Sequence, residues 1–150
     1  MNSSRPAASW PLLLLRVLGA GLLAAMAGIH LYLWSNGYDG IAWIGPLFLV
    51  NVAAGVCLGI AVLAASRRWL AVAAALGAVL QAGTLGALIL SVWVGLLGFV
   101  ESTQATLFWP SVLVEAAGAV VLAVLAAWAF IGDRAPAHAA RTADRVRSGR

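Results

Sequence analysis

Four long apolar segments dominate this chain and limit what it can fold into. They cover residues 12–34, 41–65, 70–93 and 107–131. Each is long enough to cross the roughly 30 Å hydrocarbon core of a bilayer, which takes about 20 residues of helix. A segment surrounded by lipid must satisfy its backbone hydrogen bonds internally, so each segment is predicted to be an α-helix. The sequence therefore predicts an all-α, polytopic membrane protein, a four-helix transmembrane bundle with short loops.

The composition agrees with a membrane protein and argues against a soluble one. Hydrophobic residues make up 63% of the 150 residues and charged residues only 9%, whereas about a quarter of the residues of soluble domains are charged. A water-soluble fold of this size would lack the polar side chains to cover its surface. Aromatic residues gather near the predicted ends of the spans, which is typical of the interfacial belts of membrane proteins.

The cationic residues predict the orientation of the spans. All nine are arginines, and they lie before or within the start of the first span, between the second and third spans, and after the fourth: Arg5, Arg16, Arg67, Arg68, Arg134, Arg141, Arg145, Arg147 and Arg150. The other two connections contain Asp39 and Glu101 but no cation. With four spans, all arginines fall on one side, which the positive-inside rule makes cytoplasmic. We expect a multi-pass protein of the plasma (cytoplasmic) membrane with both termini in the cytoplasm.

The two terminal segments are expected to lie outside the bundle. Residues 1–11 are predicted to be a cytoplasmic segment, and residues 132–150 a basic, disordered cytoplasmic tail attracted to anionic lipid headgroups. An alternative is that the first span is a cleaved signal peptide, with Ala25-Met26-Ala27 as its cleavage site. The continuation of the apolar run to Trp34 favours a span, and the intact mass of the protein distinguishes the two.

Several chemistries are excluded or left without support by the residues present. The single cysteine, Cys57, permits neither an intramolecular disulfide nor a CxxC redox pair. A haem held by two histidines is excluded within one chain, because His138 lies in the tail, far from His30. The candidate zinc ligands do not occur at a recognised spacing, and no hydrolase, P-loop or dinucleotide-binding motif is present. We expect no metal, no cofactor, no nucleic-acid partner and no enzymatic activity.

Polar residues inside the spans are the candidate functional residues, because unpaired polar groups are costly in lipid. They are His30, Asn51, Gln81 and Glu115, joined by Glu101 in the outer connection; Thr84 also lies within the third span. Asn51 and Gln81 both fall near mid-membrane, which predicts a hydrogen bond between them. His30 and Glu115 differ by roughly 6 Å in depth at 1.5 Å per residue, which predicts a pair nearer the outer face.

Each of these residues also has a purely structural interpretation. Asn51 and Gln81 are typical of interhelical hydrogen bonds that fasten a bundle, worth about 0.6 kcal/mol each. Glu115 is either protonated or hydrogen-bonded within the bundle, since burial disfavours a charged carboxylate. His30 is either an interfacial histidine held by Tyr32 or a loop carbonyl, or the partner of Glu115.

One stretch of the chain resembles known membrane proteins. Residues 28–34 read GIHLYLW, and residues 37–55 read GYDGIAWIGPLFLVNVAAG. Over residues 27–55 the pattern of small, apolar and aromatic residues resembles that of small integral membrane proteins of actinobacteria that carry no assigned activity. At the level of the fold, the four-span plan rich in small residues is similar to DoxX-like membrane proteins. The resemblance implies a location and a size, and it implies no reaction and no site residue.

Three functions are compatible with the sequence. The first is a non-enzymatic accessory or scaffold subunit that packs against a helical membrane partner, a second copy of itself or lipid. The second is a transporter or sensor of protons or a small ligand, using an outward-facing polar pocket. The third is an intramembrane enzyme that uses Glu115 as an acid or base, for which no motif provides support. The absence of a catalytic motif and the many small residues favour the first.

Overall fold

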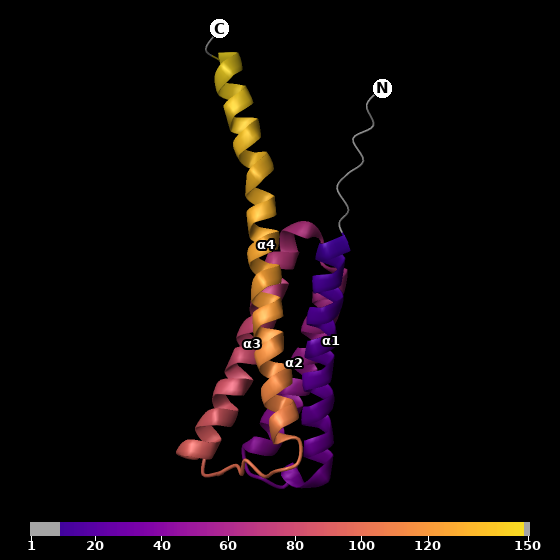
Figure 1. The fold of residues 1–150 in the computed structure, drawn as a ribbon, viewed down its shortest axis with the longest axis vertical. Coiled ribbons are helices and arrows are strands. Elements are labelled where there is room, and N and C mark those ends of the chain that lie inside the picture. The colour runs from indigo at the N-terminus through magenta and orange to yellow at the C-terminus, as the bar shows by residue number, and fades with distance from the viewer. Residues whose placement is uncertain (1–9, 149–150) are drawn as a thin grey trace.

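Four long helices form a bundle in the computed structural model, which describes the backbone of residues 10–148 and the side chains of residues 10–132. The helices are α1 (Trp10–Leu33), α2 (Ile44–Ala64), α3 (Arg67–Trp93) and α4 (Phe108–Ser148), and a short π-helix, η1 (Trp34–Tyr38), follows α1 (Figure 1). All four contain segments long and apolar enough to cross a membrane. The prediction of four such helices at these places in the chain is confirmed.

The two terminal segments compare differently with the sequence prediction. Residues 1–9 of the expected N-terminal segment lie outside the described residues. The backbone of α4 is helical as far as Ser148, and the expectation of a disordered tail over residues 132–150 stays a prediction. Alanine and arginine are strong helix formers, and a helix that already exists can be extended without a new nucleus.

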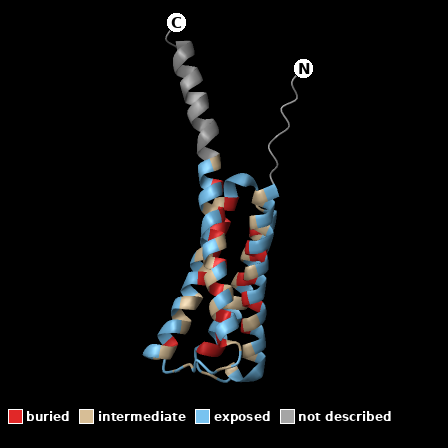
Figure 2. Ribbon diagram, in the orientation of Figure 1, coloured by how far each residue is buried: buried red, intermediate tan, exposed pale blue. Residues whose placement is uncertain are grey.

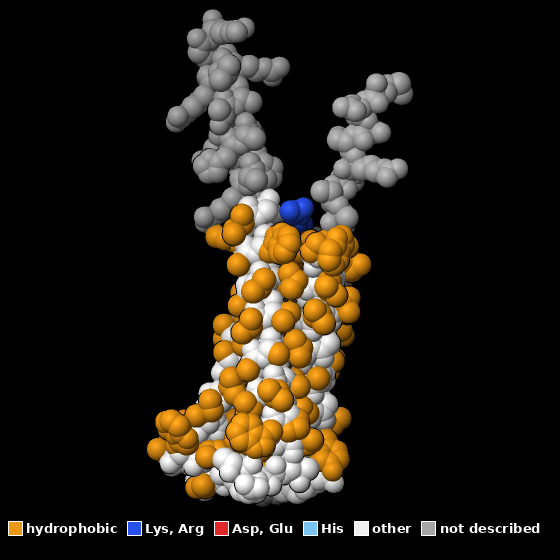
Figure 3. Space-filling view, viewed as in Figure 1, with side chains coloured by type: hydrophobic (Ala, Val, Ile, Leu, Met, Phe, Trp, Pro, Cys, Tyr) orange, Lys and Arg blue, Asp and Glu red, His pale blue; other side chains and the backbone are white. Residues whose placement is uncertain are grey.

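The helices bury one face each and expose the rest. α3 packs mainly against α4, α1 packs against α2 and α4, and α1 and α3 hardly touch. The interior is apolar, and its largest fully buried side chains include Leu23, Leu70, Leu122 and Leu125. Buried residues form stripes that face the interior in Figure 2, while Figure 3 shows apolar side chains over the visible sides of the bundle. An outer surface of this kind suits lipid rather than water.

Glycines let the helices approach closely at defined points. A Cβ on Gly55 of α2 would lie 2.9 Å from Met26 Cε and 3.1 Å from the Leu23 carbonyl oxygen of α1. Gly77 of α3 similarly faces Leu122 of α4 and Leu23 of α1. These glycines therefore serve packing inside the bundle, where dispersion drives association in lipid.

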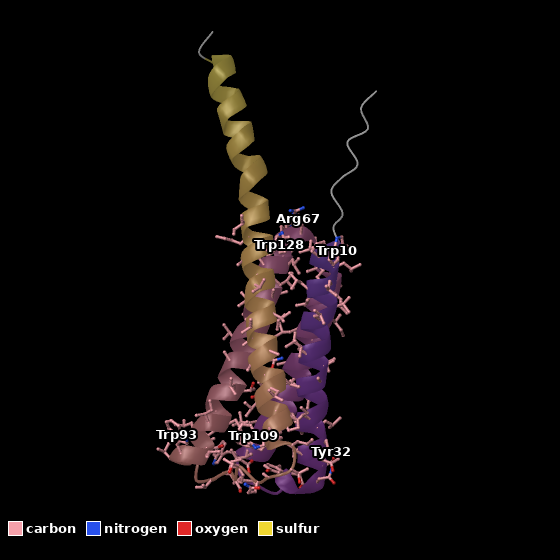
Figure 4. The ribbon with its side chains drawn as sticks, viewed as in Figure 1. Trp10, Tyr32, Arg67, Trp93, Trp109 and Trp128 are labelled. Carbon is pink, nitrogen blue, oxygen red and sulfur yellow. The ribbon has the colours of Figure 1, made fainter. Side chains whose placement is uncertain are left out.

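The two ends of the bundle differ in charge. Arg16, Arg67 and Arg68 lie at what we call the arginine end, and Asp39 and Glu101 lie in the connections at the other, the acidic end. Tryptophans or a tyrosine flank both ends: Figure 4 shows Trp10, Trp128 and Arg67 at the arginine end and Tyr32, Trp93 and Trp109 at the acidic end. This arrangement agrees with the interfacial aromatic belts predicted from the sequence.

Arg16 has a structural role at the arginine end. Its guanidinium donates hydrogen bonds to the carbonyl oxygens of Leu63, at 3.3 Å, and Ala65, at 2.7 Å. Both carbonyls lie at the C-terminal end of α2, where helix carbonyls lack partners within the helix and a positive charge is favourable. Arg16 therefore ties α1 to α2 in addition to marking the charge asymmetry.

The connection between α3 and α4 folds back over the acidic end. Residues Leu96 and Phe99 pair their backbones in a tight turn, with hydrogen bonds of 2.7 and 2.9 Å. Gly95 and Gly98 take positive φ values of 82° and 83° there, which a residue without a Cβ adopts without strain. The Glu101 N–H then donates to the Ser91 carbonyl oxygen at 3.2 Å, which holds the connection against the end of α3.

Candidate functional site

A cavity of about 430 Å³ lies in the acidic half of the bundle. All four helices contribute to its walls, and the connection between α3 and α4 contributes its outer wall. Most of its lining is apolar, with a small number of polar side chains among them. A concave, largely apolar site of about 300–1,000 Å³ with a few placed polar groups is typical of small-molecule binding.

His30 enters the cavity from the last turns of α1. The residue is only 7% exposed, and its Nδ1 lies 2.9 Å from the Met26 carbonyl oxygen, one turn earlier in the same helix. Because a carbonyl only accepts, Nδ1 carries the proton of this bond, and Nε2 of the neutral ring is left as an acceptor. The imidazole packs against the Phe48 ring of α2, with 4.8 Å between ring centroids.

Glu115 enters the cavity from α4 and has a buried oxygen without a hydrogen bond in the described part of the chain. The residue is 2% exposed, and its Oε2 atom is buried without a hydrogen-bond partner among the described residues. The Thr84 side chain of α3 is its polar neighbour, but the Thr84 hydroxyl donates within α3, to the carbonyl oxygens of Leu80 at 3.1 Å and Gln81 at 2.9 Å. A buried acceptor without a partner costs free energy that a suitable ligand group would recover.

Aromatic rings and a hydrogen bond close the outer side of the cavity. The Tyr38 hydroxyl donates to Glu101 Oε2 at 2.8 Å, and Glu101 Oε1 accepts the Ser102 N–H at 2.8 Å. The Tyr38 ring stacks on Phe48 at 5.1 Å and meets the edge of Phe99 at 5.8 Å. η1, α2 and the α3–α4 connection are thereby joined across the acidic end.

The cavity also reaches the outer surface of the bundle between α2 and α3. Leu47 of α2 and Val79 of α3 both line it, yet they are 42% and 69% exposed. Gly83 of α3 lines it too, and a Cβ added there would meet no atom within 4 Å. The site is therefore open at the side of the bundle, by a route that does not pass through the bundle core.

Four of the five candidate residues predicted from the sequence line this one cavity: His30, Asn51, Glu101 and Glu115. The fifth, Gln81, does not. It is completely buried, and its side chain packs against Gly118 of α4, where an added Cβ would overlap the amide.

Neither of the two predicted side-chain pairs forms. Both polar side-chain atoms of Gln81 lack a hydrogen-bond partner in the described part of the chain, so the expected bond to Asn51 is absent. The reason is that α3 packs mainly against α4, which turns Gln81 away from α2. Within residues 10–132, no hydrogen bond or ion pair joins His30 to Glu115, because the histidine bonds its own helix and both residues face the cavity.

Sequence reasoning did not find the aromatic wall of the site. The sequence predicts aromatic belts near the ends of the spans and does not single out Tyr38, Phe48 or Phe99 for the site. The spacing of Phe48 and Asn51 could have placed Phe48 at the site, because residues three apart share one face of a helix. The positions of Tyr38 and Phe99 depend on the folding of two connections, which helical periodicity does not describe.

A metal site finds no support in the geometry. Among the side chains that the structure describes, no three histidine, cysteine, aspartate or glutamate residues come together in a way that could hold a metal ion.

Comparisons of the chain with protein-family models, curated proteins and solved structures found no match.

Proposed function

We propose that this chain is a multi-pass protein of the plasma membrane that binds a small, membrane-soluble ligand in the acidic-end cavity, in a transport or sensing role. The acidic end faces outward in this proposal, with both termini in the cytoplasm. The observation that carries the proposal is the cavity, which combines an apolar lining, a buried Glu115 oxygen without a hydrogen bond to the described residues, and exposed lining residues between α2 and α3.

Two glycines of α3 provide a matched test. Gly83 lines the cavity, whereas Gly86 does not, and at either position an added Cβ has open space around it. Replacing Gly83 by Phe fills the cavity or its opening, and replacing Gly86 by Phe adds the same side chain outside the site. Both changes leave Arg16, the Gly55 contact and the core untouched.

The measurement is calorimetric titration of the purified full-length protein in detergent with 1-adamantanol, a compact neutral probe, corrected with protein-free micelles. We expect saturable one-to-one binding to the unchanged protein and to Gly86→Phe. Binding to Gly83→Phe should be weakened at least tenfold. If the unchanged protein shows no saturable binding, or if both variants lose it equally, the proposal is wrong.

An accessory or scaffold role remains the second candidate function, and it is supported by a different set of glycines. Gly21 and Gly28 of α1 and Gly86 of α3 are exposed, and a Cβ added at any of them would meet nothing within 4 Å. Small residues on a lipid-facing surface permit close approach of another helix. Purification in mild detergent tests this role: a partner or a second copy should copurify, and a strictly monomeric protein would count against it.

A further inference from the structure

The polar groups of the cavity are mostly hydrogen-bond acceptors. The hydroxyls of Thr84, Ser91 and Ser111 line it, but each donates its proton to a carbonyl of its own helix, at 2.7–3.1 Å. The Tyr38 hydroxyl donates to Glu101. These oxygens keep lone pairs to offer and have no proton left to give.

The ionisable groups of the cavity add further hydrogen-bond acceptors and negative charge. Two carboxyl groups, Glu101 and Glu115, line it, and no arginine does among the described residues. His30 has its Nδ1 proton committed to the Met26 carbonyl, so its neutral ring adds a further acceptor. Among the described side chains that line the cavity, the donors not already committed are the Asn51 amide and the Thr106 hydroxyl, with the Glu115 carboxyl added only when it is protonated. A ligand that carries a negative charge would meet repulsion and few donors there.

Aromatic faces surround the same space. Phe48 lies between His30 and Tyr38, and Phe99 meets the edge of Tyr38, and all four residues line the cavity. The face of an aromatic ring is electron-rich and attracts a cation within about 6 Å of the ring centroid. Rings and carboxyl groups thus favour the same kind of ligand.

The two carboxyl groups lie at different depths. Glu101 is held level with Ser91 by its backbone hydrogen bond, and Glu115 neighbours Thr84. Seven residues of α3 separate Ser91 from Thr84, which corresponds to about 10 Å along the helix. Both oxygens of Glu101 already accept hydrogen bonds, whereas Oε2 of Glu115 accepts none. Glu101 therefore contributes negative potential at the outer side, and Glu115 is the group free to bind.

We propose that the ligand is an organic cation: a compact apolar body that carries a protonated amine, whose N–H donates to the Glu115 carboxylate. This inference rests on the proposed function, and it names the ligand class of the same cavity. The ammonium group and the carboxylate neutralise each other in a site of low dielectric, where an unpaired charge of either sign would be costly. The apolar body occupies the space lined by Phe48 and extends toward the opening at Val79.

The test compares three probes that share one apolar body: 1-aminoadamantane, which is cationic, 1-adamantanol, which is neutral, and 1-adamantanecarboxylate, which is anionic. Each is titrated calorimetrically into the full-length protein in detergent at pH 7.5, with protein-free micelles as the blank. We expect the amine to bind at least tenfold more tightly than the carboxylate, with the alcohol between them.

Substitutions test whether the preference for the amine depends on Glu115. Glu115→Gln should weaken binding of the amine at least tenfold and leave binding of 1-adamantanol within about twofold. Glu101→Gln, which keeps an acceptor for Tyr38, should weaken binding of the amine less than threefold. The comparison of the three probes in the unchanged protein needs no variant, so it decides the matter even if Glu115→Gln fails to fold.

The outcomes separate the two proposals. If all three probes bind equally, and Gly83→Phe abolishes their binding, the cavity binds ligands but the inferred ligand class is wrong. An affinity for the amine that is unchanged in Glu115→Gln also overturns the inference. If none of the probes binds to the unchanged protein, both proposals fail.

Discussion

At the scale of single residues, the glycines of this bundle divide into two groups with opposite expected responses to substitution. Gly55 of α2 faces α1 so closely that a methyl group would approach Met26 Cε and the backbone of Leu23, whereas Gly28 of α1 has open space around it. Alanine is the better helix former by up to about 1 kcal/mol. Overpacking a close contact costs about 1–3 kcal/mol.

We therefore expect Gly55→Ala to lower the thermal midpoint of the protein in detergent, because the backbone of α1 must move away from α2. Gly28→Ala is the matched control and should leave the midpoint unchanged or raise it. The midpoints are measured by circular dichroism at 222 nm for both variants and the unchanged protein. Equal stability of the two variants would contradict the close packing of α1 on α2.

The residues of the site show where sequence reasoning stops. Counting residues along each span gives depth, and depth correctly placed His30 and Glu115 in the same half of the bundle. It does not give the direction in which a side chain points around the helix axis. Gln81 was therefore paired with Asn51 on the basis of depth, although the packing of α3 on α4 turns it toward Gly118.

At the scale of elements, the connection between α3 and α4 is the outer wall of the cavity. The Tyr38 side chain fastens it to the connection between α1 and α2. The Tyr38 hydroxyl of η1 donates to Glu101 at 2.8 Å, while the Tyr38 ring packs on Phe48 and Phe99. Tyr38→Phe removes the hydrogen bond and keeps the ring. The free energy of local opening should fall by about 1 kcal/mol, which makes amide exchange in residues 94–107 roughly fivefold faster.

Hydrogen–deuterium exchange with mass spectrometry measures this change. Tyr32→Phe is the control, because Tyr32 lies exposed at the same end of the bundle and its hydroxyl makes no hydrogen bond to the described residues, and its exchange should stay within about twofold of the unchanged protein. Exchange in the α1–α2 core around Leu23 should not change in either variant. An unaltered rate in residues 94–107 of Tyr38→Phe would show that this hydrogen bond does not hold the wall.

The helices themselves were far more predictable than the connections. Each predicted span agrees with a helix because lipid leaves the backbone no alternative that satisfies its hydrogen bonds. The turn at Leu96–Phe99, and the positive φ of 67° at Trp43, depend instead on contacts made only after the helices pack.

At the scale of the whole molecule, the charge difference between the two ends predicts how the bundle sits in the membrane. The described arginines cluster at one end, where Arg16 also caps α2, and Asp39 and Glu101 occupy the other. Because arginine-rich connections are retained in the cytoplasm, the acidic end and the cavity should face outward. This orientation makes the opening between α2 and α3 accessible from the outer leaflet.

Single-cysteine labelling in spheroplasts tests the orientation. Cys57, which is exposed on α2, is first replaced by alanine, and one cysteine is then introduced at Thr103 in the α3–α4 connection or at Ser66 between α2 and α3, both of them exposed. A membrane-impermeant maleimide should label Thr103→Cys in sealed spheroplasts and label Ser66→Cys only after permeabilisation. The reverse pattern would place the cavity on the cytoplasmic side, and the ligand would then have to enter from the inner leaflet. Labelling of both positions in sealed spheroplasts would contradict a bundle in which α3 crosses the membrane between them.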